Sequence, residues 1–197
     1  LIVTADCGTV PHETVSAANR AGIDVVVTDH HTVAGPLPEA VAVVNPQRPD
    51  CDYPDKDLCG CGVAYKLCAL VADALAADAG ALGAHLDLVA LATVADLVPL
   101  RGENRVLVHY GLRRFRQTTV RGLDALLKVS GVSREEVTSG RLGFAVAPRI
   151  NAAGRMGESA DALRLLLTED GREAARLAEQ LDSTNRVRRE EDKRTLA

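Results

Sequence analysis

The sequence predicts an α/β fold in which a parallel sheet with flanking helices precedes an all-helical region and a long connector helix. Three observations predict it. Short apolar runs rich in Val and Ile flank a helical segment in the first 45 residues. Helical patterning takes over from Gly60, and the last stretch, 171–197, is a strongly charged helix. Strands joined by a helix imply a right-handed crossover and therefore a parallel sheet.

The predicted strands are LIVTA (1–5), IDVVVT (23–28) and VAVVN (41–45). Each is a nearly continuous apolar run, which is typical of a strand covered on both faces. A helix is expected from Pro11 to Ala21, because Pro suits the first helical turn and Gly22 suits the end. Because the chain opens inside a predicted strand, we expect the α/β domain to be incomplete at its N-terminus.

Helical segments are expected to fill most of the remaining chain. Pro99 and Gly102 punctuate it near 98–104, so we expect an α/β domain at 1–100 and a helical region at 101–197. The expected helices are 62–78, 83–96, 103–116, 121–129, 133–147, 159–168 and 171–197.

Composition excludes several classes of protein. Hydrophobic residues make up 47% and charged residues 25%, which excludes a disordered chain. No apolar run approaches the roughly 20 residues of a membrane span, and no secretory signal is visible. The five cysteines lack the paired spacing of a zinc site. We therefore expect reduced thiols in a cytoplasmic protein that does not bind membranes.

The charge is distributed unevenly along the chain. The net charge of −4 combines −9 over residues 1–100 with +5 over residues 101–197. Within 101–155, eleven basic residues face four acidic ones. The first part could hold cations and the second an anionic polymer, although different solvated faces of one enzyme would give the same pattern.

Polar side chains follow the first two predicted strands directly. Asp6 follows the first strand, and Asp29, His30 and His31 follow the second. Ligands bind at the carboxyl ends of parallel strands, so these groups should share a crevice. Asp96 is a lone acid in the apolar stretch ALATVADLVPL, where burial would require a partner.

Carboxylates and imidazoles together suit Mn²⁺, Fe²⁺, Co²⁺ or Zn²⁺, and a bridging carboxylate would organise two ions. Taken singly, each of these residues could instead have a purely structural role. Asp6 could simply form a turn before Gly8, Asp29 could structure its loop, and Asp96 could accept a hydrogen bond at a helix end. Their joint placement favours a metal site.

The stretch from Ala147 to Gly157 mixes polar groups with small residues. Small side chains let a backbone approach a ligand closely, and Arg offers two parallel donors to a phosphate. The alternative is a tight turn between helices with solvated arginines. The polar residues are Arg149, Asn151 and Arg155.

The sequence resembles a known family. VVVTDHH matches the signature of the DHH phosphoesterase superfamily, with ADCG upstream and ATVADLVPL downstream. NPQRPDC, CGVAYKL, GENRVLVHYGL and APRINAAGRMG are similar to the RecJ branch, the 5′→3′ exonucleases specific for single-stranded DNA. The resemblance runs over nearly the whole chain, and the ordered set of motifs is specific.

This resemblance implies a role for each matching residue. Asp6, His30 and Asp96 would bind two divalent ions, Mn²⁺ or else Mg²⁺. His31 would face the scissile phosphate and Asp29 would orient the histidines. Asn151 and Arg155, with Arg149 a weaker candidate, would hold the DNA backbone.

The implied activity is metal-dependent phosphodiester hydrolysis in DNA repair and recombination, with single-strand-binding protein and a helicase as partners. The alternatives are a phosphoesterase acting on nano-RNA or cyclic dinucleotides and a non-catalytic replisome scaffold. The family's first metal motif would precede Leu1, so we expect the 197 residues alone to be nearly inactive. Cys7, Cys59 and Cys61 replace residues usual in the family, and we interpret them as tolerated changes.

Overall fold

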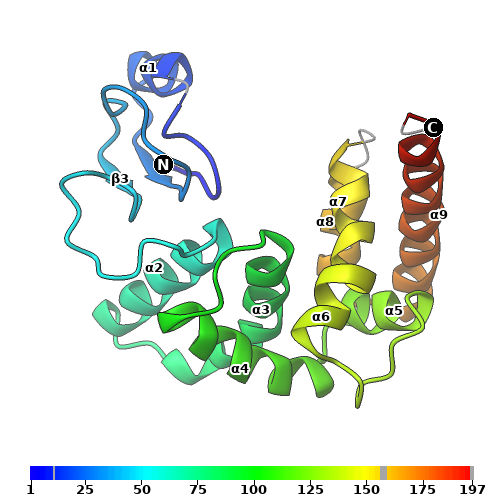
Figure 1. The fold of residues 1–197 in the computed structure, drawn as a ribbon. Coiled ribbons are helices and arrows are strands. Elements are labelled where there is room, and N and C mark those ends of the chain that lie inside the picture. The colour runs from blue at the N-terminus through cyan, green and yellow to red at the C-terminus, as the bar shows by residue number, and fades with distance from the viewer. Residues whose placement is uncertain (11, 156–158, 196–197) are drawn as a thin grey trace. The chain divides into compact units, whose positions relative to one another are not determined.

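The computed structural model describes residues 1–10, 12–155 and 159–195 (Figure 1). It divides into two compact units, Leu1–His109 and Tyr110–Ala197, and each is described below by itself. The division falls within helix α4 (Gly102–Arg116). Among the described residues, every helix is too short or too polar to cross a membrane.

A three-stranded parallel sheet lies in the first unit, as the sequence predicts. The strand order is β1-β2-β3, and Val26 of the central strand pairs with Val3 on one side and Ala42 on the other. The strands are β1 (Ile2–Val3), β2 (Val25–Thr28) and β3 (Ala42–Val44). All three run the same way, so their carboxyl ends lie along one edge of the sheet.

The expectation that all three strands are covered on both faces is wrong for β1 and β3. Ile2 and Val3 are 43% and 56% exposed, and Val41, just before β3, is 68% exposed. Only β2 has neighbours on both sides, and Val25 and Val27 are buried there. An apolar run therefore identified each strand, whereas its burial depended on its position in the sheet.

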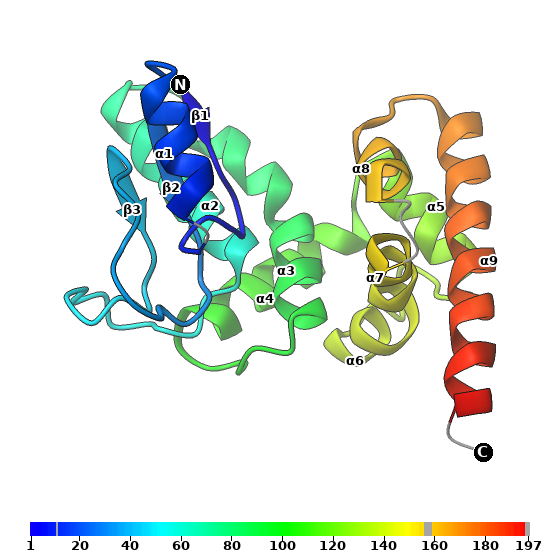
Figure 2. The same cartoon turned by 90° about the horizontal axis from the view of Figure 1, so that it is seen from above.

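Helices pack on the sheet to form the first core. Val15 of α1 (His12–Arg20) is buried against Val25 and Val27. The helix α2 (Gly60–Ala74) also packs on β2, and Figure 1 shows α1 and α2 on opposite sides of the sheet. Figure 2 gives the view from above, with α1 lying along the sheet. The first unit is thus a layered α/β structure.

The segment after α2 begins with a more tightly wound helix than the sequence predicts. A 3₁₀-helix, η1 (Ala79–His85), leads into α3 (Leu86–Ala95), where a single helix over 83–96 was predicted. The carboxylate of Asp78 accepts a hydrogen bond from the Gly80 N–H at 2.8 Å and so begins the tight turn. Asp87 and Thr93 are buried on α3, so its core face is partly polar.

The second unit is all helical. Its long helix α9 (Gly171–Thr195) buries Ala174, Leu177, Ala178 and Leu181 on one side, which confirms a helix packed along a single stripe. This stripe packs on α5, α7 and α8. The other elements are α5 (Arg121–Val129), α6 (Ser139–Arg141), η2 (Leu142–Val146), α7 (Ala147–Arg155) and α8 (Ser159–Leu167).

The helix predicted over 133–147 is wrong in its limits. The helical segment begins at Ser139, where the Thr138 hydroxyl accepts a hydrogen bond from the Arg141 N–H at 3.2 Å. It runs through the π-helical turn η2 and continues as α7. Pro148 lies at the start of α7, where its ring would crowd the carbonyl of Phe144, and the wide π-turn relieves that crowding.

Candidate metal centre

Asp6 lies in the tight turn that follows β1. Its φ angle is +66°, a left-handed conformation that Asp tolerates better than most residues. The Thr4 hydroxyl donates to the carbonyl of Cys7 at 2.6 Å and closes this turn. Asp6 therefore does form the turn that the sequence allowed as its alternative role. The turn also leaves its carboxylate exposed and directed at His30.

His30 follows β2 and lies between two carboxylates. Its Nε2 atom is 2.9 Å from Oδ1 of Asp6, and its Nδ1 atom is 3.6 Å from Oδ2 of Asp96. The imidazole is 13% exposed, whereas the side chains of Asp6 and Asp96 are 63% and 42% exposed, so both carboxylates stay open to solvent. Among the described residues, His30 is the only ion-pair partner of either acid. No lysine or arginine in that part of the chain neutralises them.

Asp29 is a buried carboxylate that holds the loop after β2. Its Oδ1 accepts from the His30 N–H at 2.8 Å and from His31, and its Oδ2 accepts from the Thr9 N–H at 3.0 Å. Burial by itself would raise the pKa of Asp29. The hydrogen bonds from His31 and Thr9 outweigh burial and hold the pKa far below its ordinary value. Asp29 is therefore ionised throughout the neutral range.

His31 is oriented by Asp29. Its Nδ1 atom is 2.7 Å from Oδ1 of Asp29, and because an ionised carboxylate only accepts, Nδ1 carries the proton. This bond raises the pKa of His31 above its ordinary value. The side chain is 63% exposed, so Nε2 is left to face a ligand. The predicted orienting role of Asp29 thus has a geometric counterpart at His31, whose ring lies 4.5 Å from that of His30 and is tilted against it by 48°.

A third strand end contributes a residue that the sequence analysis passed over. Asn45 follows β3, is 3% exposed, and donates to the carbonyl of His31 at 2.9 Å and to the Thr9 hydroxyl at 3.1 Å. It thereby ties the loop after β2 to the rest of the edge. Its position directly after an apolar strand was the signal, the same one that identified Asp6 and Asp29.

The donor atoms of Asp6, His30 and His31 all lie within 4.8 Å of one another. One carboxylate and two imidazoles at this spacing fit a divalent transition metal such as Mn²⁺. Asp96, the C-cap residue of α3, lies outside this compact group and faces the opposite ring nitrogen of His30. It is also 42% exposed, so it is not the buried acid that its apolar surroundings suggested.

The residues predicted to contact phosphate belong to the second unit. Asn151 is exposed on α7 and lines a shallow pocket of about 520 Å³ between α7 and α8. Arg149 is only 15% exposed and pairs with Asp182 of α9 at 2.7 Å, and it also donates to the carbonyls of Val129 and Ala145. The side chain of Arg155 lies outside the described residues.

The interpretation of the small residues in this stretch needs correction. Ala152 and Ala153 are fully buried within α7, which packs on α8 and α9. They serve close packing of helices and do not open the backbone to a ligand. Gly154 is exposed, and nothing lies near the position that its side chain would occupy. The stretch is helical as far as Arg155, so the alternative of a tight turn between helices is also wrong for that part.

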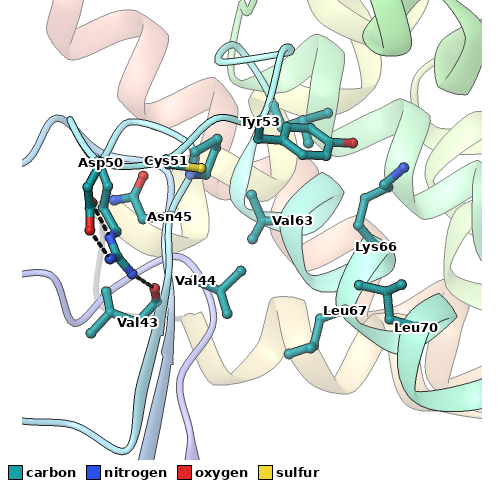
Figure 3. Close-up of a pocket in the computed structure, with 13 residues that line it drawn as sticks. Val43, Val44, Asn45, Asp50, Cys51, Tyr53, Val63, Lys66, Leu67 and Leu70 are labelled. Carbon is teal, nitrogen blue, oxygen red and sulfur yellow. Dashed lines mark hydrogen bonds and ion pairs between the residues drawn. The ribbon is translucent and has the colours of Figure 1, made fainter. Parts of the chain in front are cut away.

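A second hollow, of about 440 Å³, lies between β3 and α2, away from the metal-binding candidates (Figure 3). Figure 3 shows Val44 on one side of it and Val63 and Leu67 on the other. The basic groups in its lining are already paired, since Arg48 binds Asp50 and Lys66 binds Glu103 at 2.7 Å. None of the predicted site residues lines it.

A parallel sheet whose strand ends gather carboxylates and imidazoles defines an α/β protein with a candidate metal-binding edge. Residues 1–93, just under half of the chain, match the model described as DHH family, N-terminal domain. The DHH triplet of the model's name is Asp29, His30 and His31 here.

Similarity to individual proteins extends over both units. The chain is 42% identical to the single-stranded-DNA-specific exonuclease RecJ of Bacillus subtilis, over 95% of this chain and 23% of that protein. It is 42% identical to RecJ of Escherichia coli, over 96% of this chain and 35% of that protein. The chain thus spans about a quarter to a third of the length of these curated relatives.

Solved structures agree with this similarity. The crystal structure of Thermus thermophilus RecJ in complex with Mn²⁺ has a TM-score of 0.88 and 37% identity, covering 98% of this chain and 29% of that one. A structure of exonuclease RecJ bound to manganese has a TM-score of 0.89 and 36% identity, covering 98% and 48%. The sheet and helices described above are therefore the fold found in these proteins.

Proposed function

We propose that this chain carries part of the active site of a metal-dependent 5′→3′ exonuclease specific for single-stranded DNA. The observation that carries the proposal is the cluster of Asp6, His30 and His31 at the carboxyl ends of adjacent parallel strands. The names of the relatives support the substrate, and the manganese-bound structures support the ion. Roles in repair and recombination, with a helicase and single-strand-binding protein in the cytoplasm, form part of the proposal.

Two divalent ions, Mn²⁺ or else Mg²⁺, would be held by Asp6, His30 and Asp96. The chemistry supplied at such a site is activation of a water nucleophile and stabilisation of negative charge on the phosphoryl group. The unneutralised carboxylates of Asp6 and Asp96 on either side of His30 support this assignment.

His31 would act on the substrate directly. Because Nδ1–H donates to Asp29, a charged ring can also donate a hydrogen bond from Nε2–H, at its exposed edge, to a phosphate oxygen. Asp29 would keep this ring in one orientation, since four donors fix its own position. In the second unit, Asn151 and Arg155 would hold the DNA backbone, whereas Arg149 would have to leave its bond to Asp182.

The test uses the purified protein in the longest form that its gene encodes, with 5′-labelled single-stranded DNA and Mn²⁺. We expect release of labelled mononucleotides that is lost in Asp6→Ala and His30→Ala. Asp24→Ala is the matched control, because Asp24 precedes β2 at the opposite end of the sheet and should retain full activity. Full activity in Asp6→Ala and His30→Ala, or a preference for two-to-five-residue RNA over long DNA, would overturn the proposal.

A further inference from the structure

Gly60, the first residue of α2, lies against the carboxylate of Asp6. A Cβ atom built on Gly60 would be 2.2 Å from Oδ1 of Asp6 and 2.7 Å from both its Cβ and its Cγ. Real carbon atoms do not approach this closely, so any side chain at this position would displace Asp6 or α2. The two residues are 54 positions apart in the sequence and come from different elements.

The backbone of Gly60 does not itself require glycine. Its φ angle is outside the left-handed region, unlike that of Gly8 at +114°. Alanine is the better helix former at a position of this kind. The reason for glycine is therefore the space that Asp6 occupies.

The backbone of both partners is held in place. Asp6 is held in its turn by the bond between Thr4 and Cys7. The start of α2 is held by Cys59, which is 2% exposed; its Sγ accepts from the Gly62 N–H at 3.4 Å and lies 3.5 Å from the Thr93 hydroxyl of α3. A methyl group on Gly60 would consequently push on the ligand side chain, because the helix end is anchored.

We propose that Gly60 is a positioning residue that sets how closely the Asp6 carboxylate approaches His30, and hence how tightly the cluster binds a divalent ion. This inference rests on the metal site of the proposed function. A displacement of even 1 Å would take the Asp6 oxygen out of the 2.9 Å contact with Nε2 of His30. Gly60 itself donates nothing to the ion and acts only through Asp6.

The first experiment compares Gly60→Ala with Gly62→Ala by titration with Mn²⁺, following free Mn²⁺ by electron paramagnetic resonance. Gly62 is two residues along the same helix, and the atoms nearest to a Cβ there, from Leu58 and Cys59, would be at ordinary distances of 3.6 to 3.7 Å. We expect about a 10- to 100-fold loss of Mn²⁺ affinity in Gly60→Ala, the range seen when groups that orient a ligand are changed. Gly62→Ala should bind as the wild type does, and equal binding by both variants would overturn the inference.

The second experiment measures the steric contact without any metal. Asp6→Gly removes all three atoms that the new methyl group would meet. The melting temperature should fall on adding Gly60→Ala to the wild type but not on adding it to Asp6→Gly. An equal fall in both backgrounds would overturn the inference, because it would show that the methyl group meets something other than Asp6.

These two experiments separate this inference from the proposed function. A wild-type protein that releases no nucleotides would contradict the exonuclease, while the melting cycle would still decide whether Gly60 positions Asp6. Conversely, an active exonuclease whose Gly60→Ala variant keeps full Mn²⁺ affinity would leave the exonuclease in place and overturn the role of Gly60.

Discussion

Two charged clusters in this protein differ in how their charges are balanced. At the strand ends of the first unit, Asp6 and Asp96 both face His30, which is the only ion-pair partner of either within the described chain. In the second unit, Arg149 is enclosed by Asp182 and two backbone carbonyls, and Asp182 also binds Arg186. The buried pair of Arg149 and Asp182 is neutralised within the fold, so breaking it should destabilise the fold. The carboxylates of Asp6 and Asp96 have only His30 as a partner in the described chain and are available to a cation.

The contrast predicts opposite consequences for substitutions in the two clusters. Changes at Arg149 should lower the free energy of unfolding without altering metal affinity. Changes around Asp6 should lower metal affinity with a smaller effect on folding. The following experiments test that separation.

The largest expected effect is on stability, from Arg149→Ala. The side chains of Arg149 and Asp182 are 15% and 13% exposed, so removing Arg149 leaves the largely buried Asp182 paired, within the described residues, only with the exposed Arg186. We expect the free energy of unfolding to fall by about 3 kcal/mol in urea titrations, with Mn²⁺ affinity unchanged.

Arg186→Ala is the control for that loss, because Arg186 binds the same carboxylate from a 71% exposed position. It should cost less than about 1 kcal/mol. Equal losses from the two arginines would contradict a buried structural role for Arg149.

Gly122→Ala should be nearly as damaging to the second unit. Gly122 lies where α5 meets α8, and a Cβ there would be 2.0 Å from the backbone carbonyl oxygen of Leu165. The helices would have to separate, at a cost of up to about 3 kcal/mol measured by thermal unfolding.

Gly154→Ala in α7 is the matched control, since nothing lies near its added methyl group. It should raise stability by up to about 1 kcal/mol. Gly122 and Gly60 both allow another group to approach closely. At Gly122 that group is the backbone carbonyl of Leu165, and at Gly60 it is the side chain of the candidate ligand Asp6.

Asp29→Asn should act mainly on the metal site. The amide keeps the shape of Asp29, but its NH₂ group cannot accept the hydrogen bonds that the second carboxylate oxygen accepts now. The orientation of His31 would no longer be fixed, and we expect Mn²⁺ affinity to fall about 10- to 100-fold in calorimetric titrations.

The exposed Asp50, which pairs with Arg48, provides the control for Asp29. Asp50→Asn should leave Mn²⁺ affinity unchanged. Wild-type affinity in Asp29→Asn would contradict the orienting role.

The smallest expected effect is the pH dependence of the bond between Lys66 and Glu103. Burial raises the pKa of Glu103, but hydrogen bonds from Lys66 and Tyr53 outweigh it and lower the pKa below its ordinary value of 4.5. The bond to Glu103 raises the pKa of Lys66 above 10.5. A lowered pKa of the acid stabilises the fold at pH values above its ordinary pKa, and that stabilisation is lost as pH falls through the lowered pKa. A raised pKa of the lysine stabilises the fold at pH values below its ordinary pKa, and that stabilisation is lost as pH rises through the raised pKa.

The stabilisation should therefore be constant between about pH 5 and pH 10 and decline on either side. Both side chains are 38% exposed, so solvent screening limits the effect to less than about 1 kcal/mol. Unfolding titrations of wild type and Glu103→Gln at pH 3.5 and pH 7 would measure it. A difference between the two proteins that is the same at both pH values would contradict the assignment.

Much of this architecture could be predicted from local pattern. Apolar runs identified all three strands and the parallel sheet, and the rule that ligands lie at strand ends singled out Asp6, Asp29, His30 and His31. The limits of one helix were predicted less well. The helix predicted over 133–147 begins at Ser139 and extends to Arg155 through a π-turn, because a Thr cap and Pro148 decide its course.

The sequence by itself determined which chemical groups follow each strand, how charge is divided along the chain, and which family it resembles. These follow from residue order and spacing, which are local properties. Only the tertiary structure decided that Arg149 is neutralised by a residue 33 positions away, that His30 lies between Asp6 and Asp96, and that Gly60 leaves the space in which Asp6 lies. Whether a charge is paired depends on groups that folding brings together from far along the chain, and no local pattern records those distances.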